Sequence, residues 1–340
     1  MDQGFDDKAI LVTGGTGSFG RAFCRMVLER YRLRKLIVFS RDELKQFEMA
    51  NKPPFRDNPA ARLFIGDVRD VDRLQMAFRD VDYIVHAAAM KQIETAEYNP
   101  FECLKTNVHG AENIVTAAIR TGVGRVIALS TDKAANPINL YGASKLASDK
   151  IFVAAKNLVG RGDPLFSVVR YGNVVGSRGS VIPYFQRLIA DGATSLPITD
   201  TRMTRFWITI EQGVEFVLSC FQMMHGGEIF VPKIPSMKVI DLARTMAPHL
   251  PTHVIGIRPG EKLHEVMITE DEARTTLELP DRYVIRPMVY GDSYVYEAGG
   301  AAVDEGFRYC SDQNQNWLDI PTMTDILRGA GVQAPAVAAE

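Results

Sequence analysis

The sequence has almost no excess of charge of either sign and no long apolar run. Its 39 lysines and arginines meet 41 aspartates and glutamates, which gives a net charge of −2, so no nucleic-acid partner is expected. No apolar stretch approaches the roughly 20 residues of a membrane span. Residues 1–7 lack the basic and apolar regions of a secretory leader. We therefore expect a cytoplasmic protein with no membrane partner.

Cysteine is scarce, and the histidines are poorly placed for a metal. The cysteines lie far apart and form no CxxC pair, which indicates reduced thiols rather than disulfides or a zinc site; they are Cys24, Cys103, Cys220 and Cys310. His249 and His253 are at helical spacing, but Pro251 between them disfavours a helix. No HExxH pattern is found, and the sequence predicts no metal site.

Short apolar runs alternate with amphipathic stretches over about residues 1–175. This alternation is typical of a parallel sheet covered by helices. The expected strands are rich in Ile, Val, Leu and Phe, as doubly buried strands are; they are 8–13, 35–39, 63–65, 83–87, 125–130 and 166–171. Expected helices are 20–31, 104–121 and 140–158. The predicted fold class is α/β, a Rossmann-like doubly wound sheet that binds ligands at the carboxyl ends of its strands.

The rhythm of the sequence changes after residue 171, where prolines and glycines become frequent. We predict a Rossmann domain over 1–175 with a returning segment near 205–232, which includes a strand at 228–231 that rejoins the main sheet. A smaller mixed lobe should take up most of 176–330, and mainly the stretch after Ser236. Residues 331–340 should form a flexible tail.

A glycine-rich segment joins the first expected strand to the first expected helix. It reads TGGTGSFG over residues 13–20. Glycine permits a tight turn and lets backbone amides approach a pyrophosphate at a helix N-terminus. Because the segment lies directly between strand and helix, it indicates dinucleotide binding. The residues expected at the cofactor here and after later strands are Thr13, Gly14, Gly17, Ser18, Phe19, Gly20, Asp67, Val68, Ala87, Ala88 and Ala89.

The residues after the second strand bear on which dinucleotide is bound. NAD sites usually place an acidic residue here, whereas this chain has Ser40 and Arg41, followed by Asp42 and, one turn later, Lys45. Two cations and a hydroxyl suit a 2′-phosphate, so NADP is favoured over NAD. The alternative is that the two cations only pair with neighbouring acids on a solvated helix.

Two pairs of titratable residues follow the fifth strand. Tyr141 and Lys145 share one helix face. A lysine charge beside a phenol lowers the pKa of the phenol, so that the tyrosinate can act as a base toward a substrate hydroxyl. Lys145 can also hold the nicotinamide ribose, and Thr131 supplies a nearby hydroxyl. The adjacent Asp132 and Lys133 indicate further proton transfers, to a leaving hydroxyl and from a carbon beside a carbonyl. The alternative for this pair is a local ion pair.

Several motifs in collinear order resemble those of the inverting UDP-N-acetylglucosamine 4,6-dehydratases, extended short-chain dehydrogenases that open pseudaminic acid synthesis for flagellin glycosylation. They are TGGTGSFG, SRDELKQ, HAAAMKQ, STDKA, NPINLYGASK, RYGNVVGSRGSVIPYF and RPGEKLHE, over about residues 6–290. Related dehydratases of other groups typically carry Met where this chain has Tyr141.

The resemblance implies a redox-neutral lyase reaction on UDP-N-acetylglucosamine. Tyr141, assisted by Lys145 and Thr131, would take the C4 hydroxyl proton as hydride passes to NADP. Lys133 would remove the C5 proton, and Asp132 would protonate the departing C6 hydroxyl. Hydride would return to C6 and C5 would be reprotonated on the opposite face, giving a UDP-4-keto-6-deoxy-L-hexose.

The resemblance also implies substrate contacts and an assembly state. The diphosphate of the substrate would carry about two negative charges, and arginine side chains, which can donate two hydrogen bonds at once, are suitable partners. The implied substrate residues are Lys91, Asn173, Ser180, Val181, Ile182, Pro183, Arg205, Arg258 and Glu261. The smaller lobe would hold most of the substrate, and the family commonly forms homo-oligomers from dimers to hexamers.

Two other functions stay open on sequence grounds. One is a UDP-sugar 4-epimerase or a net reductase of the same fold, and the other is a non-catalytic NADP-binding regulator. Epimerases and reductases need neither a C5 base nor a C6 acid, so Asp132 and Lys133 favour the dehydratase. A binding module has no use for four titratable groups at one strand end. The stereochemistry at C5 is not fixed by the sequence.

Overall fold

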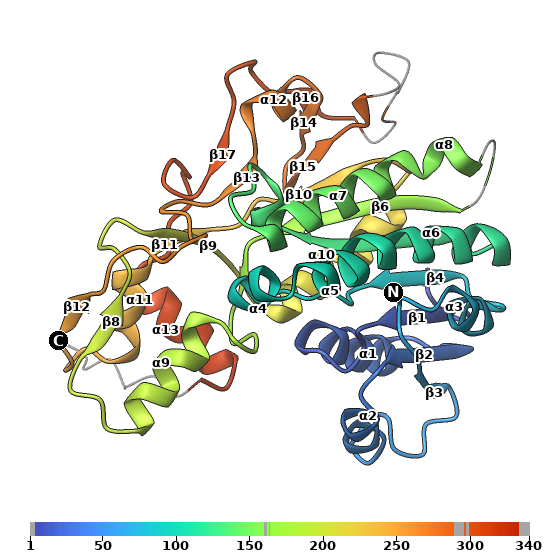
Figure 1. Cartoon of the computed structure of the whole chain (residues 1–340), viewed down its shortest axis with the longest axis horizontal. Coiled ribbons are helices and arrows are strands. Elements are labelled where there is room, and N and C mark those ends of the chain that lie inside the picture. Colours follow the sequence, from blue (N-terminus) through green and yellow to red (C-terminus); the bar gives the residue numbers. More distant parts are fainter. Residues whose placement is uncertain (1–3, 160–161, 163, 289–295, 297–298, 333–340) are drawn as a thin grey trace.

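The computed structural model describes residues 4–159, 162, 164–288, 296 and 299–332. Its centre is one large sheet with the strand order β16-β14-β15-β10-β6-β5-β4-β1-β2-β3 (Figure 1). The parallel part of this sheet consists of β1 (Ala9–Thr13), β2 (Lys35–Ser40), β3 (Ala61–Ile65), β4 (Tyr83–His86), β5 (Arg125–Thr131), β6 (Leu165–Tyr171) and β10 (Ile229–Pro232). The predicted doubly wound α/β fold is confirmed.

The central strands are apolar because they are buried on both faces. All five residues of β1 are buried, and Ile10 lies between Leu36 of β2 and Tyr83 of β4. The strand order reverses beside β1, where β2 and β3 lie on one side and β4 to β6 on the other. In such sheets this reversal opens a crevice at the carboxyl ends of the strands.

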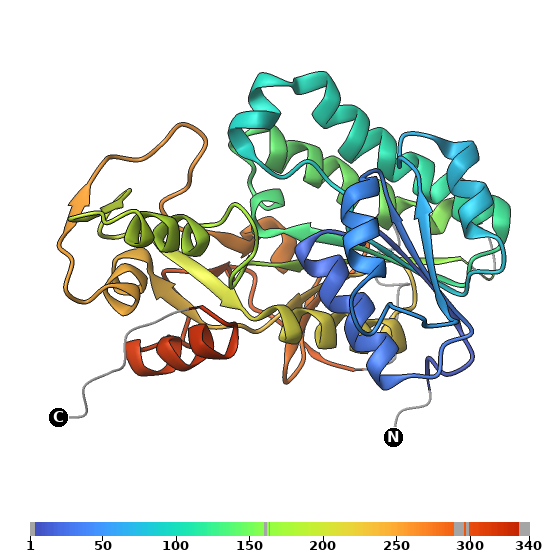
Figure 2. The same ribbon diagram turned by 90° about the horizontal axis from the view of Figure 1, so that it is seen from below.

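Helices cover both faces of the sheet. α1 (Ser18–Arg30) packs against α10 (Ile210–Met223), while α3 (Val71–Phe78) packs against α6 (Gly110–Thr121) on the opposite face (Figure 2). The remaining helices of this region are α2 (Glu43–Ala50), α4 (Ile93–Tyr98), α5 (Pro100–Leu104), α7 (Leu140–Ala154) and α8 (Lys156–Val159).

Two expected helices differ from those observed. The helix expected over 104–121 is interrupted by a π-helical turn at Lys105–His109 that joins α5 to α6. The helix expected over 140–158 divides into α7 and α8 at Ala155. Both errors concern the ends of elements, where local packing decides and periodicity carries little information.

A smaller lobe lies beside the carboxyl ends of the sheet strands (Figure 1). It contains a second apolar core that includes Phe185, Trp207, Leu242 and Met323. Its main elements are α9 (Val181–Ala190), α11 (Val239–Met246), α13 (Ile320–Gly329), the strand pair β8 (Leu196–Ile198) and β12 (Thr252–Val254), and the sheet of β7 (Asn173–Val174), β9 (Thr204–Ile208) and β11 (Ser236–Lys238).

The main sheet extends further along the chain than expected. The strand near 228–231 joins the main sheet as β10, as predicted, and pairs parallel to β6. Beyond it, however, β15 (Arg282–Ile285), β14 (Thr276–Glu278) and β16 (Ala301–Ala302) add antiparallel strands to the same sheet, although these segments were assigned to the smaller lobe. The two-domain division stays a prediction, and residues 333–340 of the expected tail lie outside the described residues.

Three further observations bear on the absences noted in the sequence. The four cysteines are buried and free. Within the described ranges, no group of three or more His, Cys, Asp and Glu side chains is placed to hold a metal ion. In the same residues, no helix combines the length and the apolar character needed to cross a membrane.

Candidate active site

A cleft of about 1110 Å³ runs along the carboxyl ends of the sheet strands and into the smaller lobe. All the residues predicted for cofactor, catalysis or substrate line it, with two exceptions. Thr13 is fully buried, and its hydroxyl is 2.8 Å from Nδ1 of His86. Ile182 is fully buried in the core of the smaller lobe. Neither side chain lines the cleft itself, and both lie behind its wall.

The glycine-rich turn is shaped by close backbone contacts. Gly14 has a φ of +64°, and a Cβ there would lie 2.8 Å from the amide nitrogen of Ala88. A Cβ on Gly20 would lie 2.6 Å from the carbonyl oxygen of Gly14. Side chains are thus excluded where the turn meets α1 and the end of β4. The resulting cradle of backbone at a helix N-terminus fits a pyrophosphate.

The two cations after β2 have different partners. Asp42 caps α2 by accepting a hydrogen bond from the amide of Lys45 at 3.0 Å, and it also pairs with the Lys45 ammonium. Arg41 makes one long contact of 3.5 Å to Asp67, and its side chain is 58% exposed. Asp67 in turn is held by Arg69 at 2.7 Å. Lys45 therefore follows the ion-pair alternative, and Arg41 is the cation that is available to a ligand.

Tyr141 and Lys145 face the cleft from the first turns of α7. Asn139 caps the start of this helix, and its side-chain oxygen accepts a hydrogen bond of 2.8 Å from the amide of Gly142. Burial raises the pKa of Tyr141 to about 12, and the Lys133 charge opposes this rise. The residues alone predict that this opposing charge belongs to Lys145, whereas in the structure it comes mainly from Lys133. Burial lowers the pKa of Lys145, although Asp149 opposes this effect.

Asp132 and Lys133 form the short helical turn that ends β5. The Asp132 side chain is 1% exposed, and its Oδ1 accepts hydrogen bonds of 2.8 Å from Thr131 and from the Lys133 ammonium. Its Oδ2 is buried with no partner. Burial raises the pKa of Asp132, although the Lys133 charge opposes the rise. The pair is thus an ion pair, as the alternative held, and it also lines the cleft.

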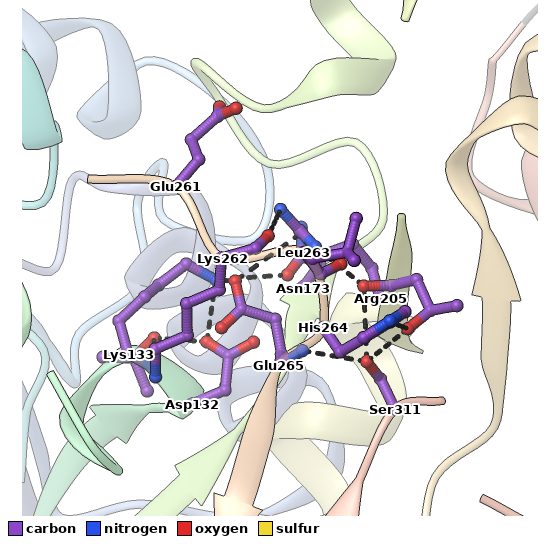
Figure 3. A network of polar contacts seen from close by, with 12 residues as sticks. Asp132, Lys133, Asn173, Arg205, Glu261, Lys262, Leu263, His264, Glu265 and Ser311 are labelled. Carbon is purple, nitrogen blue, oxygen red and sulfur yellow. Dashed lines mark hydrogen bonds and ion pairs between the residues drawn. The ribbon is translucent and has the colours of Figure 1, made fainter. Parts of the chain in front are cut away.

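Glu265, which sequence reasoning missed, completes this cluster (Figure 3). It lies just before β13 (Val266–Ile268), and its Oε1 is 3.1 Å from the Lys133 ammonium and 3.6 Å from Nε of Arg205. Burial disfavours the charge on Lys133, but the carboxylates of Asp132 and Glu265 outweigh burial and raise its pKa. The only sequence signal for Glu265 is that it ends the RPGEKLHE segment.

Arg205 is occupied by the loop that precedes Glu265. Its guanidinium donates hydrogen bonds to the carbonyls of Thr204 at 2.7 Å, Lys262 at 3.0 Å and Leu263 at 3.2 Å. The residue is 7% exposed. It therefore anchors the loop, and a direct contact with a diphosphate stays a prediction.

Other cations line the substrate end of the cleft. Arg258 is about half exposed and lies 3.9 Å from Glu261. Lys91 donates a hydrogen bond of 2.8 Å to the carbonyl of Arg178, and burial lowers its pKa, assisted by the Lys133 charge. Arg187 of α9, which was not predicted, lines the same wall. These side chains suit an anionic ligand.

Gly142 fixes the distance between α7 and the Asp132–Lys133 turn. A Cβ at this position would overlap the carbonyl oxygen of Lys133. We expect Gly142→Ala to destabilise the fold by about 1–3 kcal/mol and to lower turnover, because the backbone of the Asp132–Lys133 turn must shift. Urea denaturation and activity assays measure the two effects. Gly306→Ala, at a site with nothing near its Cβ, is the control. Equal behaviour of the two variants would contradict this role.

A family model described as "Polysaccharide biosynthesis protein" matches residues 10–287. The chain belongs to this family of polysaccharide biosynthesis proteins. A member from Campylobacter jejuni, named "UDP-N-acetylglucosamine 4,6-dehydratase (inverting)", is 56% identical over 330 residues, which cover 95% of this chain and 98% of that relative. The resemblance seen in the sequence motifs is thereby confirmed. A protein of Rickettsia conorii named "UDP-glucose 4-epimerase" is 41% identical over 338 residues, covering 95% of this chain and 96% of that one.

Solved structures of related proteins have the same architecture. The X-ray structure of Pen from Bacillus thuringiensis has a TM-score of 0.88 at 34% identity, covering 97% of this chain and 99% of that one. A dTDP-glucose 4,6-dehydratase from Streptomyces venezuelae, described with NAD and TYD bound, has a TM-score of 0.67 at 25% identity, covering 75% of this chain and 86% of that one.

Proposed function

We propose that this protein is an inverting UDP-N-acetylglucosamine 4,6-dehydratase, a lyase that uses NADP. The observation that carries the proposal is the Asp132–Lys133 pair, a buried carboxylate beside a partly exposed ammonium, which lines the cleft with Tyr141. It supplies an acid and a base beyond those that a 4-epimerase or a reductase needs. The 56% identity to the Campylobacter jejuni dehydratase over nearly the whole chain supports the same activity.

In the proposed reaction, each residue transfers one proton. The bound dinucleotide would accept hydride from C4 of the sugar and return it to C6, so no net redox change occurs. Tyr141 takes the C4 hydroxyl proton, and Thr131 and Lys145 orient it. Lys133 takes the C5 proton, which the 4-keto group has made acidic, while Asp132 gives a proton to the C6 hydroxyl as it leaves as water. As hydride returns to C6, a solvent proton reaches the opposite face of C5. The two protons gained by Tyr141 and Lys133 then balance the one given by Asp132 and the one taken up at C5.

A mass measurement separates the proposed reaction from its alternatives. Incubation of UDP-N-acetylglucosamine with enzyme and a trace of NADP should give a nucleotide sugar lighter by one water, with no net NADPH. An unchanged mass with a new C4 configuration would favour the epimerase, and stoichiometric NADPH use would favour a reductase. Binding of NADP without any reaction would favour the regulator.

The choice of NADP rests on Arg41, the exposed cation at the end of β2. A 2′-phosphate would sit within reach of this guanidinium, and a charged hydrogen bond of this kind contributes about 1.5–3 kcal/mol. We expect Arg41→Glu to weaken NADP binding at least about 10-fold and to leave NAD binding nearly unchanged, as measured by calorimetry. Arg62→Glu, at an exposed position of β3, is the control. Equal losses for both dinucleotides in Arg41→Glu would contradict the assignment.

The remaining features of the proposal concern the assembly and the setting of the enzyme. A cytoplasmic homo-oligomer, from dimer to hexamer, fits large apolar side chains that stand exposed on neighbouring helices: Tyr98 is 88% exposed and Phe101 75%. Light scattering of the purified protein tests this. The product would feed pseudaminic-acid-type sugar synthesis for flagellin glycosylation.

A further inference from the structure

Glu265 is a buried carboxylate in which one oxygen forms ion pairs and the other has no hydrogen-bond partner. The residue is 2% exposed, Oε1 lies 3.1 Å from the Lys133 ammonium, and Oε2 is buried without a partner. Its backbone is held by Ser311, whose hydroxyl accepts from the Glu265 amide at 2.9 Å and whose amide donates to the Glu265 carbonyl at 2.8 Å. The carboxylate is therefore fixed in place from behind (Figure 3).

Glu265 is not the sole counter-charge of Lys133. Lys133 already has a counter-charge in Asp132 at 2.8 Å. Glu265 adds a second carboxylate, which is offset by Arg205 at 3.6 Å. Burying an additional charge is unfavourable unless it is well paired. A glutamate in such a place indicates a role that needs its negative charge beside Lys133.

The Asp132–Lys133 pair can exist in two forms with the same net charge. If one proton moves across their 2.8 Å hydrogen bond, the ion pair becomes a neutral amine and a neutral carboxylic acid. Elimination of water needs this neutral form, because the amine takes the C5 proton while the acid gives its proton to the C6 hydroxyl. At the end of the step the lysine is an ammonium again and Asp132 is a carboxylate, so protons and charges balance.

On the basis of the proposed dehydratase reaction, we propose that Glu265 is a positioning residue that holds the Lys133 amine at the cleft and stabilises the ammonium formed when it takes the C5 proton. Oε1 faces the nitrogen at which the positive charge appears. Preorganised charges that face a developing charge are among the strongest contributions to catalysis. Glu265 has no part in oxidation at C4, which depends on Tyr141.

The effect on pH dependence has a definite sign. The charged and titratable groups that face the Lys133–Glu265 contact are Lys91, Asp132, Tyr141, Arg205 and Lys262. The neutral Asp132–Lys133 pair loses its activity when it gains a proton at low pH and when it loses one at high pH. A plot of kcat against pH should therefore be bell-shaped. A neighbouring carboxylate makes every proton harder to lose. Removing it should move the alkaline limb of the bell to lower pH.

The test variant is Glu265→Gln, which keeps the shape and removes the charge. We expect kcat for the 4-keto-6-deoxy product to fall about 100-fold, with KM within about twofold. In a single turnover, NADPH should form at the wild-type rate and then persist, because C4 oxidation proceeds and elimination is slow. The alkaline limb of kcat should move down by about one pH unit or more. Glu265→Asp, which restores the charge, should recover part of the rate.

Matched controls separate this role from a structural one. Glu270→Gln removes the same charge from the exposed start of α12 (Glu270–Ala273) and should leave the rate and the pH profile unchanged. Thermal unfolding and NADP titration monitor the integrity of each variant. Carbon NMR of lysine labelled at Cε, with Lys133 assigned by Lys133→Arg, reports its charge directly, and Glu265→Gln should lower the pH at which Lys133 loses its proton.

Different experimental results would contradict the role of Glu265 and the proposed dehydratase function. If Glu265→Gln kept kcat within about threefold of wild type, or if its Lys133 titrated as in wild type, the inference would be wrong. An equal slowing of NADPH formation and product release would also overturn it, because that result indicates a general disturbance. If wild type made no dehydrated sugar, the proposed function would fail, and the lysine titration would still decide how Glu265 acts on Lys133.

Discussion

Lys133→Met should lose at least about 1000-fold in formation of the dehydrated sugar, while C4 oxidation continues. The substitution removes the group proposed to take the C5 proton, and Tyr141 keeps its place on α7. NADPH should therefore appear on mixing with UDP-N-acetylglucosamine and fail to be reoxidised. Stopped-flow absorbance of the nicotinamide, together with chromatography of the sugar nucleotides, measures both steps.

The same substitution should also affect stability. Without the ammonium, the buried carboxylates of Asp132 and Glu265 face each other with no charge between them. Breaking a buried ion pair in this way costs about 3–5 kcal/mol, and part of this cost is avoided if a carboxylate takes up a proton. Lys233→Met, which breaks the surface pair with Glu278, should cost under about 1 kcal/mol and leave turnover intact. Rapid reoxidation of NADPH in Lys133→Met would contradict the assigned role.

Tyr141→Phe should stop the reaction one step earlier. Its phenol is the proposed base for the C4 hydroxyl, so its removal should slow NADPH formation itself by about 10²–10⁴-fold. The sign of the pH dependence follows from burial, which raises the pKa of Tyr141 to about 12 in the absence of ligands. Deprotonated tyrosine becomes more abundant as pH rises toward that pKa. The wild-type rate of C4 oxidation should therefore increase with pH, and the variant should lose this dependence.

A control for Tyr141→Phe is available on the same helix, at an exposed position away from Tyr141 and Lys145. Lys150→Met alters an exposed position of α7 and should behave as wild type, which would show that the helix tolerates substitution. NADPH formation at the wild-type rate in Tyr141→Phe would exclude Tyr141 as the C4 base. Together, the two variants should divide the reaction into its oxidation half and its elimination half.

Local pattern was sufficient to predict the strand, glycine-rich turn and helix at the start of the chain and the placement of Tyr141 and Lys145 on one helix. The strand, glycine-rich turn and helix of residues 9–30 follow one another directly in the sequence, and helical spacing alone places Tyr141 and Lys145 on one face. Such features depend on short stretches of chain, for which periodicity and turn chemistry are informative. The doubly wound order of the sheet then followed from general rules of connection.

Contacts between segments far apart in the sequence could not be predicted from local sequence patterns. Glu265 reaches Lys133 across 132 residues of chain only because β13 pairs with β17 (Tyr309–Cys310) next to the end of β5. The role of Arg205 changed for the same reason, since its partners are backbone carbonyls of the 262–263 segment. Neither contact leaves a trace in spacing or composition. The antiparallel strands beyond β10 are only two to four residues long, which is too short for residue alternation to predict their pairing.

The most direct test of the central claim is proton NMR of UDP-N-acetylglucosamine incubated with the enzyme and a trace of NADP in deuterated water. We predict a 4-keto sugar with a C6 methyl group, deuterium at C5, the C5 coupling of an inverted centre and no net NADPH. A 4-epimer without deuterium at C5 would contradict the account, because Lys133 would then have no proton to remove. Deuterium at C5 with retained configuration would contradict the inversion alone.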